Sequence, residues 1–233
     1  MPSSSHLTRT GRFQAEVTAL SMLSPRMRRI TLAAPELAGV AWPLACDVAV
    51  ALAGPDGREV RRRYTVRAAA GDSIVLDAVL HGHGPGSSWA AGLQLGDQVG
   101  FVGPRGEIAP ADADWLLALT DEAGLPAIAA LAEALGGHPV TVLAELADEG
   151  ERYPLPANAD PHWLSRDGQP AGSAELLLGA LATWQPPAGR GYAYALGESR
   201  AVVRWRDELA RLGLGRESVY AKGYWNLNAR PTR

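Results

Sequence analysis

The hydrophobic pattern changes character near residue 110, and this change restricts the chain to a fold of two parts. Before that point, six short segments of alternating apolar and polar residues are separated by turn residues. Short alternating strands at this spacing favour a small antiparallel barrel. After Pro110, apolar strand-like runs alternate with helical patterns, which is typical of a parallel sheet. The sequence therefore predicts a β + α/β chain, with the barrel first.

The expected boundaries follow from the same patterns. The barrel occupies residues 1–109 and the α/β domain residues 110–233, joined by a link over 103–114. The barrel strands are predicted at 13–20, 27–32, 47–52, 62–67, 73–80 and 98–102. In the second part, strands are predicted at 115–120, 140–146, 162–165, 191–196 and 218–224, and helices at 125–135, 174–182 and 200–212.

The segment Arg61-Arg62-Arg63-Tyr64-Thr65-Val66-Arg67 combines positive charge, an aromatic ring and a hydroxyl. A flavin dinucleotide has matching needs, because its pyrophosphate accepts a guanidinium fork and its ring accepts a flat apolar face. Side chains alternate along an extended segment, so we expect Arg63 and Thr65 on one face. Tyr64 is expected to cover the flavin with its hydroxyl near water, and Thr65 to hydrogen-bond the ring. The alternative is an edge strand with solvated arginines.

A glycine-rich segment follows the next predicted strand and leads into a short helical pattern. It comprises His81-Gly82-His83-Gly84-Pro85-Gly86-Ser87-Ser88-Trp89-Ala90. Amides at a helix start form an anion site, and Ser87 or Ser88 is the expected cap. The spacing differs from the βαβ dinucleotide fingerprint, and a glycine-rich hairpin turn is the alternative. Beside the Arg63 segment, phosphate binding is the favoured interpretation.

Short motifs along most of the chain together resemble the siderophore-interacting protein family, a branch of the ferredoxin-reductase-like flavoproteins that reduces ferric siderophores. In order, the matching pieces are Met27-Arg28-Arg29-Ile30-Thr31-Leu32, Arg63-Tyr64-Thr65-Val66-Arg67, Val79-Leu80-His81-Gly82, Gly84-Pro85, Trp89-Ala90, Gly103-Pro104-Arg105-Gly106, Asp114-Trp115, Asp121-Glu122, Leu125-Pro126-Ala127-Ile128 and Gly223-Tyr224-Trp225.

The resemblance implies that the barrel binds FAD, and that an NAD(P)H-binding-like domain follows it with a C-terminal segment that returns to the flavin. It implies reduction of a ferric siderophore with electrons from NADPH, NADH or a reduced ferredoxin. Hard oxygen donors hold ferrous iron more weakly, so reduction releases the metal. The FAD contacts expected from the two motifs are Arg63, Tyr64, Thr65, Val66, Val79, His81, Gly84, Pro85, Gly86, Ser87 and Ser88.

Asp121 and Glu122 stand where the family usually has Gly-Asp-Glu-Thr-Ala-Leu-Pro, and this chain departs from that pattern at Thr120 and Ala123-Gly124. Two interpretations remain open: the carboxylates orient a nicotinamide, or they cap the following helix and favour its dipole. Capping is slightly favoured. The segment Gly197-Glu198-Ser199, after a later strand, likewise belongs to a ligand loop or to an ordinary N-cap.

The C-terminal segment contains Lys222, the only lysine of the chain, and Trp225. A compact ammonium suits a diffuse anion such as a ferric siderophore. We expect Lys222 and Trp225 to contact the substrate, with compositional accident and core packing as the alternatives. The family often has an arginine after the tryptophan, whereas this chain has Asn226.

Composition excludes several function classes. The net charge of −3 gives no electrostatic case for nucleic acid binding. One cysteine, Cys46, fits a reducing compartment. Without an apolar signal core or a membrane-length run, the expected location is cytoplasmic, with no membrane insertion. The five histidines are dispersed, so no protein metal site is predicted.

Two rival functions remain beside siderophore reduction. One is a general NAD(P)H:flavin oxidoreductase or electron carrier. The other is a siderophore-binding protein without enzymatic activity, which the altered Thr120–Gly124 stretch makes conceivable.

Overall fold

The computed structural model describes residues 10–54, 56–82 and 84–227. Contacts along the chain divide it into two compact units, Met1–Ala109 and Pro110–Arg233. None of the helices among the described residues is long and apolar enough to cross a membrane.

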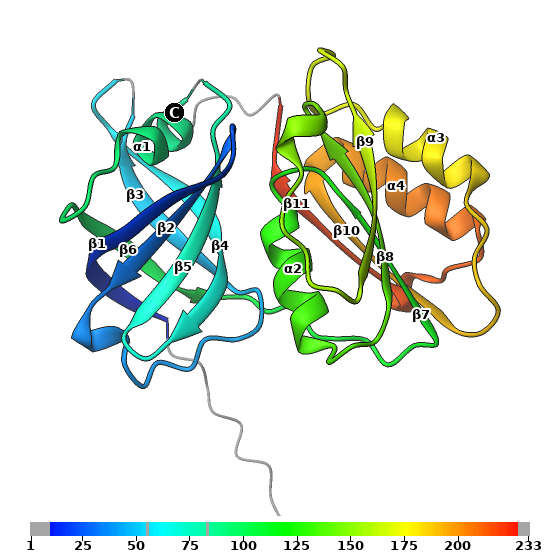
Figure 1. The fold of residues 1–233 in the computed structure, drawn as a ribbon, viewed down its shortest axis with the longest axis horizontal. Coiled ribbons are helices and arrows are strands. Elements are labelled where there is room, and N and C mark those ends of the chain that lie inside the picture. Colours follow the sequence, from blue (N-terminus) through cyan, green and yellow to red (C-terminus); the bar gives the residue numbers. More distant parts are fainter. Residues whose placement is uncertain (1–9, 55, 83, 228–233) are drawn as a thin grey trace, which may run out of the picture. The chain divides into compact units, whose positions relative to one another are not determined.

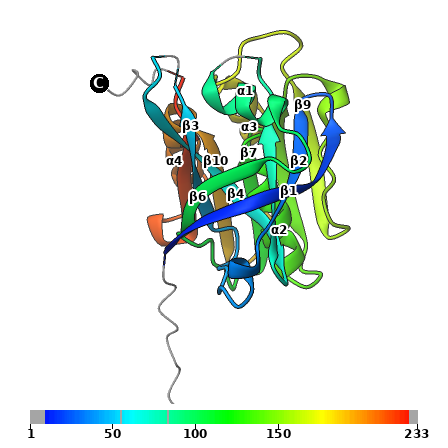
Figure 2. The same cartoon turned by 90° about the vertical axis from the view of Figure 1, so that its left-hand side faces the viewer.

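The first unit is a closed barrel of six antiparallel strands in the order β1-β2-β5-β4-β3-β6 (Figures 1 and 2). Alternate side chains such as Val48, Val50 and Leu76 fill its interior, which confirms the predicted barrel. A helix, α1 (Pro85–Gly92), contacts β3 and β5 and adds Ala90 to the core. The strands are β1 (Gly11–Ser24), β2 (Met27–Ala33), β3 (Asp47–Ala53), β4 (Glu59–Ala70), β5 (Ser73–Val79) and β6 (Gln98–Arg105).

The second unit is a five-stranded parallel sheet in the order β11-β10-β7-β8-β9, as the strand–helix alternation predicts. One helix, α2 (Leu125–Ala134), covers one face, and α3 (Glu175–Thr183) and α4 (Ser199–Arg211) cover the other (Figure 1). Since β8 and β10 lie on opposite sides of β7, the chain reverses its direction of winding between β7 and β10. The strands are β7 (Trp115–Thr120), β8 (Val140–Leu146), β9 (Ala159–Ser165), β10 (Gly191–Glu198) and β11 (Val219–Trp225).

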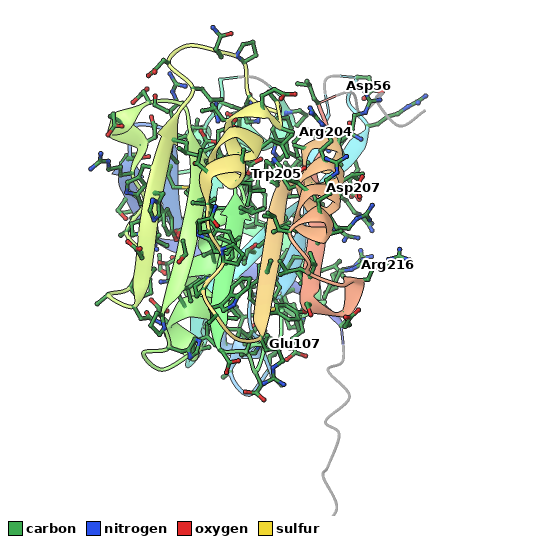
Figure 3. The ribbon with its side chains drawn as sticks, turned by 90° about the vertical axis from the view of Figure 1, so that its right-hand side faces the viewer. Asp56, Glu107, Arg204, Trp205, Asp207 and Arg216 are labelled. Atoms are coloured by element: carbon green, nitrogen blue, oxygen red, sulfur yellow. The ribbon has the colours of Figure 1, made fainter. Side chains whose placement is uncertain are left out.

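The residues of α4 divide between core and solvent as the helical pattern predicts. Trp205 is buried in the sheet–helix core, and its indole Nε1 donates to the carbonyl of Ala174 at 3.3 Å. Arg204 and Asp207 are exposed on the other side of the helix (Figure 3). This apolar stripe therefore stabilises the fold.

Several boundaries differ from the predicted ones. β1 and β4 are longer because their ladders continue through exposed residues that carry little hydrophobic pattern. β6 continues to Arg105, so the link between the units begins later than predicted, at Gly106. Three short 3-10 helices were not predicted: η1 (Pro35–Leu37), η2 (Glu149–Glu151) and η3 (Arg216–Ser218).

Candidate functional site

In the first unit, strand β4 presents the predicted Arg63 and Thr65 on the face opposite to Tyr64. Thr65 lies opposite Asp47 of β3 in the ladder. The Arg63 side chain is 57% exposed, and its Nε lies 3.9 Å from Asp47 Oδ1. Thr65 itself is buried. A guanidinium and a hydroxyl thus line one face of the strand, with the Asp47 carboxylate beside the guanidinium.

Tyr64 packs against helix α1. Its hydroxyl donates to the carbonyl of Gly86 at 3.2 Å, and its ring centroid lies 5.1 Å from that of Trp89. Burial raises the pKa of this hydroxyl, partly offset by the nearby Arg62 charge. The expectation that the Tyr64 hydroxyl lies near water is therefore wrong, because the start of α1 provides its acceptor.

Gly84 and Gly86 allow this tight approach of helix and strand. Gly84 has a φ of +83°, a conformation that favours glycine. A Cβ added to Gly86 would lie 2.9 Å from the Tyr64 hydroxyl and 3.3 Å from Arg62 Cγ. The absence of a side chain at Gly86 therefore lets the helix start approach the Tyr64 hydroxyl.

The predicted capping of α1 by Ser87 or Ser88 is wrong. The N-cap is Gly84, with no side-chain cap hydrogen bond. The buried Ser87 Oγ instead accepts from the backbone amides of His81 at 3.0 Å and Gly82 at 3.2 Å. Ser87 therefore fixes the glycine loop from inside, while Ser88 is exposed.

The remaining predicted flavin contacts lie on the same two segments. Val66 belongs to the barrel core, and Val79 is the half-buried last residue of β5. His81 is exposed in the loop after β5, and Pro85 is the first residue of α1. The structure thus brings Tyr64, the end of β5 and the glycine segment together at the start of α1, whereas Arg63 and Thr65 lie on the other face of β4.

Arg28 of β2 holds the opposite end of α1, and the sequence analysis did not single it out for this role. Its guanidinium donates to the carbonyls of Ala90, Ala91 and Leu93 at 2.7, 2.8 and 2.9 Å. These include carbonyls that a helix end leaves without partners. Arg28 consequently fixes the direction in which α1 points its amino end.

In the second unit, Asp121 binds the protein's own donors at the carboxyl edge of the sheet. Its Oδ1 accepts from the Ala123 amide at 2.9 Å, and its Oδ2 accepts from the Glu198 amide at 3.0 Å and the Trp225 indole at 2.7 Å. Burial and the neighbouring Glu122 raise the pKa of Asp121 to about 6, although these hydrogen bonds oppose the rise.

Neither predicted carboxylate caps α2. The N-cap there is Gly124, without a side-chain hydrogen bond, so the slightly favoured capping interpretation is wrong. The N-cap interpretation is confirmed at Glu198, whose Oε2 accepts from the amides of Arg200 and Ala201 at 2.6 and 2.9 Å.

Glu122 instead joins a buried cluster that the sequence analysis missed. Arg166, after β9, donates to both oxygens of Glu122 at 2.6 and 3.0 Å and to Glu145 Oε1 at 3.2 Å. Burial raises the pKa of Glu145 to about 7, although Arg166 opposes the rise. The available signal was a charged residue, Glu145, inside the apolar run of β8.

The two predicted substrate contacts both belong to β11. The ammonium of Lys222 lies 5.3 Å from the centroid of the Tyr224 ring. Trp225 is half-buried, held by the Asp121 carboxylate and by Ser199 Oγ, which donates to the Trp225 carbonyl at 2.7 Å. Trp225 therefore has a structural partner at the carboxyl edge of the sheet.

Within the described parts of the chain, no group of three or more histidine, cysteine, aspartate or glutamate residues is arranged to hold a metal ion.

Family models match both units. Residues 47–108 match the siderophore-interacting FAD-binding domain, and residues 113–228 match the siderophore-interacting protein model. The ferric vibriobactin reductase ViuB of Vibrio cholerae serotype O1 is 33% identical over 185 residues, or 73% of this chain and 66% of that protein. The NADPH-dependent ferric-chelate reductase of Escherichia coli is 28% identical over 161 residues, or 66% and 61% respectively. The chain thus spans 61–66% of the length of these two relatives.

A solved structure extends the likeness to both units. The siderophore utilization protein from T. fusca is 32% identical, with a TM-score of 0.86, and the match covers 96% of each chain. The resemblance seen in the sequence motifs is thereby confirmed, and the chain belongs to the siderophore-interacting protein family, with that family's FAD-binding domain in its barrel.

Proposed function

We propose that this protein uses FAD to reduce ferric siderophores and so releases ferrous iron. The observation that carries the proposal is the match of both units, in one chain, to the two siderophore-interacting family models. The names of two relatives, a ferric vibriobactin reductase and a ferric-chelate reductase, support it. The cytoplasmic location expected from the sequence is part of the proposal.

The barrel residues fit FAD. Arg63 offers an exposed guanidinium for a phosphate on one face of β4, and the start of α1, on the Tyr64 side of that strand, offers backbone amides for another. Thr65 is on the face of β4 that carries Arg63 and is proposed to hydrogen-bond the flavin ring. Tyr64 and Ser87 act on this site by fixing α1 and its loop. His81, Pro85, Ser88, Val66 and Val79 are proposed to contribute contacts from the same segments.

In this reaction the main task of the protein is to position the flavin and the ferric chelate. FAD, when bound, accepts two electrons with a hydride and can release them one at a time. Each electron converts one ferric ion into a ferrous ion, which hard oxygen donors hold less tightly. The protein must hold the flavin and bring the chelate within electron-transfer range. No general base or nucleophile is required by this scheme.

We propose Lys222 and Trp225 as substrate contacts. Many siderophores carry catecholate or hydroxamate groups, so their ferric complexes are often anionic, and a lysine ammonium attracts such a ligand. Lys222 lies over the ring of Tyr224, which supports an aromatic and cationic surface on β11. The proposed electron donor is NADH, NADPH or a reduced ferredoxin; Asp121 and Glu122 are held by protein donors, so any contact with a nicotinamide would be made from these fixed positions.

An anaerobic absorbance titration tests the proposal. The FAD-loaded protein is reduced with each donor in turn and then mixed with a ferric siderophore. Bleaching of the flavin band, followed by its return as ferrous iron appears, is the expected result. Turnover of free flavin or dyes but not of siderophores would favour a general flavin oxidoreductase. Tight siderophore binding without flavin would favour a carrier.

Variants connect this assay to the proposed site. Arg63→Ala is expected to loosen FAD, because it removes a charge-assisted contact worth about 1.5–3 kcal/mol. Arg58→Ala, in the β3–β4 hairpin, removes another exposed arginine that is paired with Asp56 and serves as the control. Equal FAD affinity in both variants would show that Arg63 does not contact FAD.

A further inference from the structure

The end of strand β8 is unusually acidic. Glu145 lies on β8, and Asp148, Glu149 and Glu151 follow within six residues. β8 is the direct neighbour of β7 in the parallel sheet, so these residues follow the same carboxyl edge as the Thr120–Gly124 turn. In open parallel sheets, nucleotides bind outside this edge, at the point where the winding reverses. Here that point lies between β7 and β10.

This position normally decides which nicotinamide nucleotide binds. In dinucleotide-binding sheets, an acidic residue about 20 positions after the first turn hydrogen-bonds the ribose hydroxyl of NAD, whereas a nearby arginine accommodates the 2′-phosphate of NADP. Glu145 stands at that separation from Gly124. Glu145 thus matches the acidic residue of that pattern in its separation along the chain.

The two arginines that follow β8 are already engaged in ion pairs. Between Glu145 and the end of β9 the only arginine is Arg152, and it forms an ion pair with Glu149. Arg166, directly after β9, is bound by Glu122 and Glu145. Neither guanidinium is therefore available to a 2′-phosphate without breaking a pair that the protein makes itself.

Glu145 also retains an unused acceptor. Its Oε2 is buried and has no hydrogen-bond partner among the described residues, and the residue is 2% exposed. Asp121 and Glu122 lie close enough to act on its charge. A buried acceptor in such surroundings disfavours the approach of a further negative charge.

We infer that the acidic end of β8, formed by Glu145, Asp148 and Glu149, makes the donor site selective for NADH against NADPH. This inference rests on the proposed function, since it concerns the donor of the same reaction. A 2′-phosphate would bring a charge of about −1.5 to −2 at pH 7 into this group of carboxylates. The ribose 2′-hydroxyl of NADH brings no charge and can donate a hydrogen bond. The selectivity arises mainly from repulsion of the wrong nucleotide.

Binding measurements on the FAD-loaded full chain test the inference. The dissociation constants of NAD⁺ and NADP⁺ are compared by isothermal titration calorimetry at low salt, beside the KM values for NADH and NADPH. We expect the 2′-hydroxyl nucleotide to bind at least about tenfold more tightly. The ratio should shrink at high ionic strength, because salt screens exposed charges. Equal binding, or tighter binding of NADP⁺, overturns the inference.

The Glu149→Gln variant sharpens the test. It removes one carboxylate and releases Arg152, and both side chains are exposed (64% and 58%), so folding should be preserved. We expect NADP⁺ to bind about threefold more tightly, the size of one exposed ion pair, with NAD⁺ unchanged. Glu175→Gln removes the same charge from a pair with Arg204 on the α3–α4 surface and is the matched control (Figure 3). If the affinity for NADP⁺ changes equally in both variants, the acidic end of β8 does not determine nucleotide selectivity.

A separate arm distinguishes this inference from the proposed function. The flavin is reduced chemically with dithionite, without any nucleotide, and a ferric siderophore is then added. If the siderophore reoxidises the flavin but neither nucleotide binds, the proposed reductase chemistry stands and the NADH inference is overturned. If NAD⁺ binds selectively but the siderophore leaves the reduced flavin unchanged, the inference stands and siderophore reduction fails.

Discussion

The carboxylate of Asp121 accepts a 2.7 Å hydrogen bond from the indole of Trp225, which lies 104 residues later in the chain. The same Oδ2 accepts from the Glu198 amide, so one buried oxygen joins the ends of β7, β10 and β11. These strands flank the reversal in the sheet winding, where ligands usually bind. The C-terminal segment is thereby fixed to the carboxyl edge of the sheet.

Asp121→Ala should destabilise the protein strongly. The change leaves the donors of Ala123, Glu198 and Trp225 without their acceptor, and a single buried unsatisfied donor costs about 1–3 kcal/mol. We expect a loss of about 3 kcal/mol in the free energy of unfolding, measured by urea denaturation. Asp112→Ala is the control, because Asp112 is 99% exposed in its pair with Arg190. A loss no larger than in the control would contradict the bridging role of Asp121.

Stability should fall as the pH rises from about 5 to 8. Burial raises the pKa of Glu145 from 4.5 to about 7 and that of Asp121 from 3.8 to about 6. The folded state therefore holds these protons more tightly than the unfolded state does. Their stabilising effect is complete below the unfolded values and is lost as the pH passes through the folded values. Thermal unfolding across this pH range measures the trend.

Glu145→Gln should remove part of that fall. Glutamine keeps an oxygen for Arg166 but needs no deprotonation in a buried site. At pH 8 we expect a melting temperature about 2–4 °C above that of the parent, which corresponds to about 1 kcal/mol in a chain of this size. At pH 5, where Glu145 is protonated in the folded state, the difference should vanish. A lower melting temperature at pH 8 would mean that Arg166 requires the charge of Glu145.

The local hydrophobic pattern of the sequence predicted most of the strands and helices but few of the side-chain hydrogen bonds. Alternation predicted all six barrel strands, and the parallel sheet followed from the change of period near residue 110. The sequence predicted that the segment with Glu198 is either an N-cap or a ligand loop. The N-cap could be foreseen because its side chain bonds backbone amides only two or three residues later. The partners of Arg28 are more than 60 residues away, and no local pattern encodes them. Ser87 was misassigned for a related reason: its hydroxyl turns back to the loop instead of to its own helix.

Arg28→Ala should weaken FAD binding without touching the proposed site directly. Its guanidinium holds the carboxyl end of α1 through three carbonyls, and the amino end of that helix is the proposed phosphate contact. We expect FAD affinity to fall about tenfold, which corresponds to about 1.4 kcal/mol of binding free energy. This is less than the full free energy of three charge-assisted hydrogen bonds, because the variant acts on FAD only through the position of α1. Flavin fluorescence titration measures it. Arg12→Ala, an exposed arginine of β1, is the control and should bind FAD as the parent does.

Gly86→Ala and Gly92→Ala should have opposite effects on the stability of the protein, although both place a methyl group on α1. A Cβ at Gly86 would lie 2.9 Å from the Tyr64 hydroxyl, whereas nothing lies within 4 Å of one at Gly92. Overpacking of this kind typically costs about 1–3 kcal/mol. We therefore expect Gly86→Ala to displace the start of α1 and to weaken FAD binding. Gly92→Ala should leave FAD binding intact and raise stability by up to about 1 kcal/mol, because alanine favours helix.

The double variant Gly86→Ala/Tyr64→Phe identifies the cause of any loss at Gly86. Phenylalanine removes the hydroxyl oxygen that the new methyl group would meet, so FAD affinity should partly recover relative to Gly86→Ala alone. Tyr64→Phe by itself should cost about 0.5–1.5 kcal/mol of stability, the net worth of its bond to the Gly86 carbonyl. If the double variant binds FAD no better than Gly86→Ala, the contact between Tyr64 and the helix start does not control the site. Recovery would instead show that a single strand-to-helix distance sets the position of the phosphate-binding backbone.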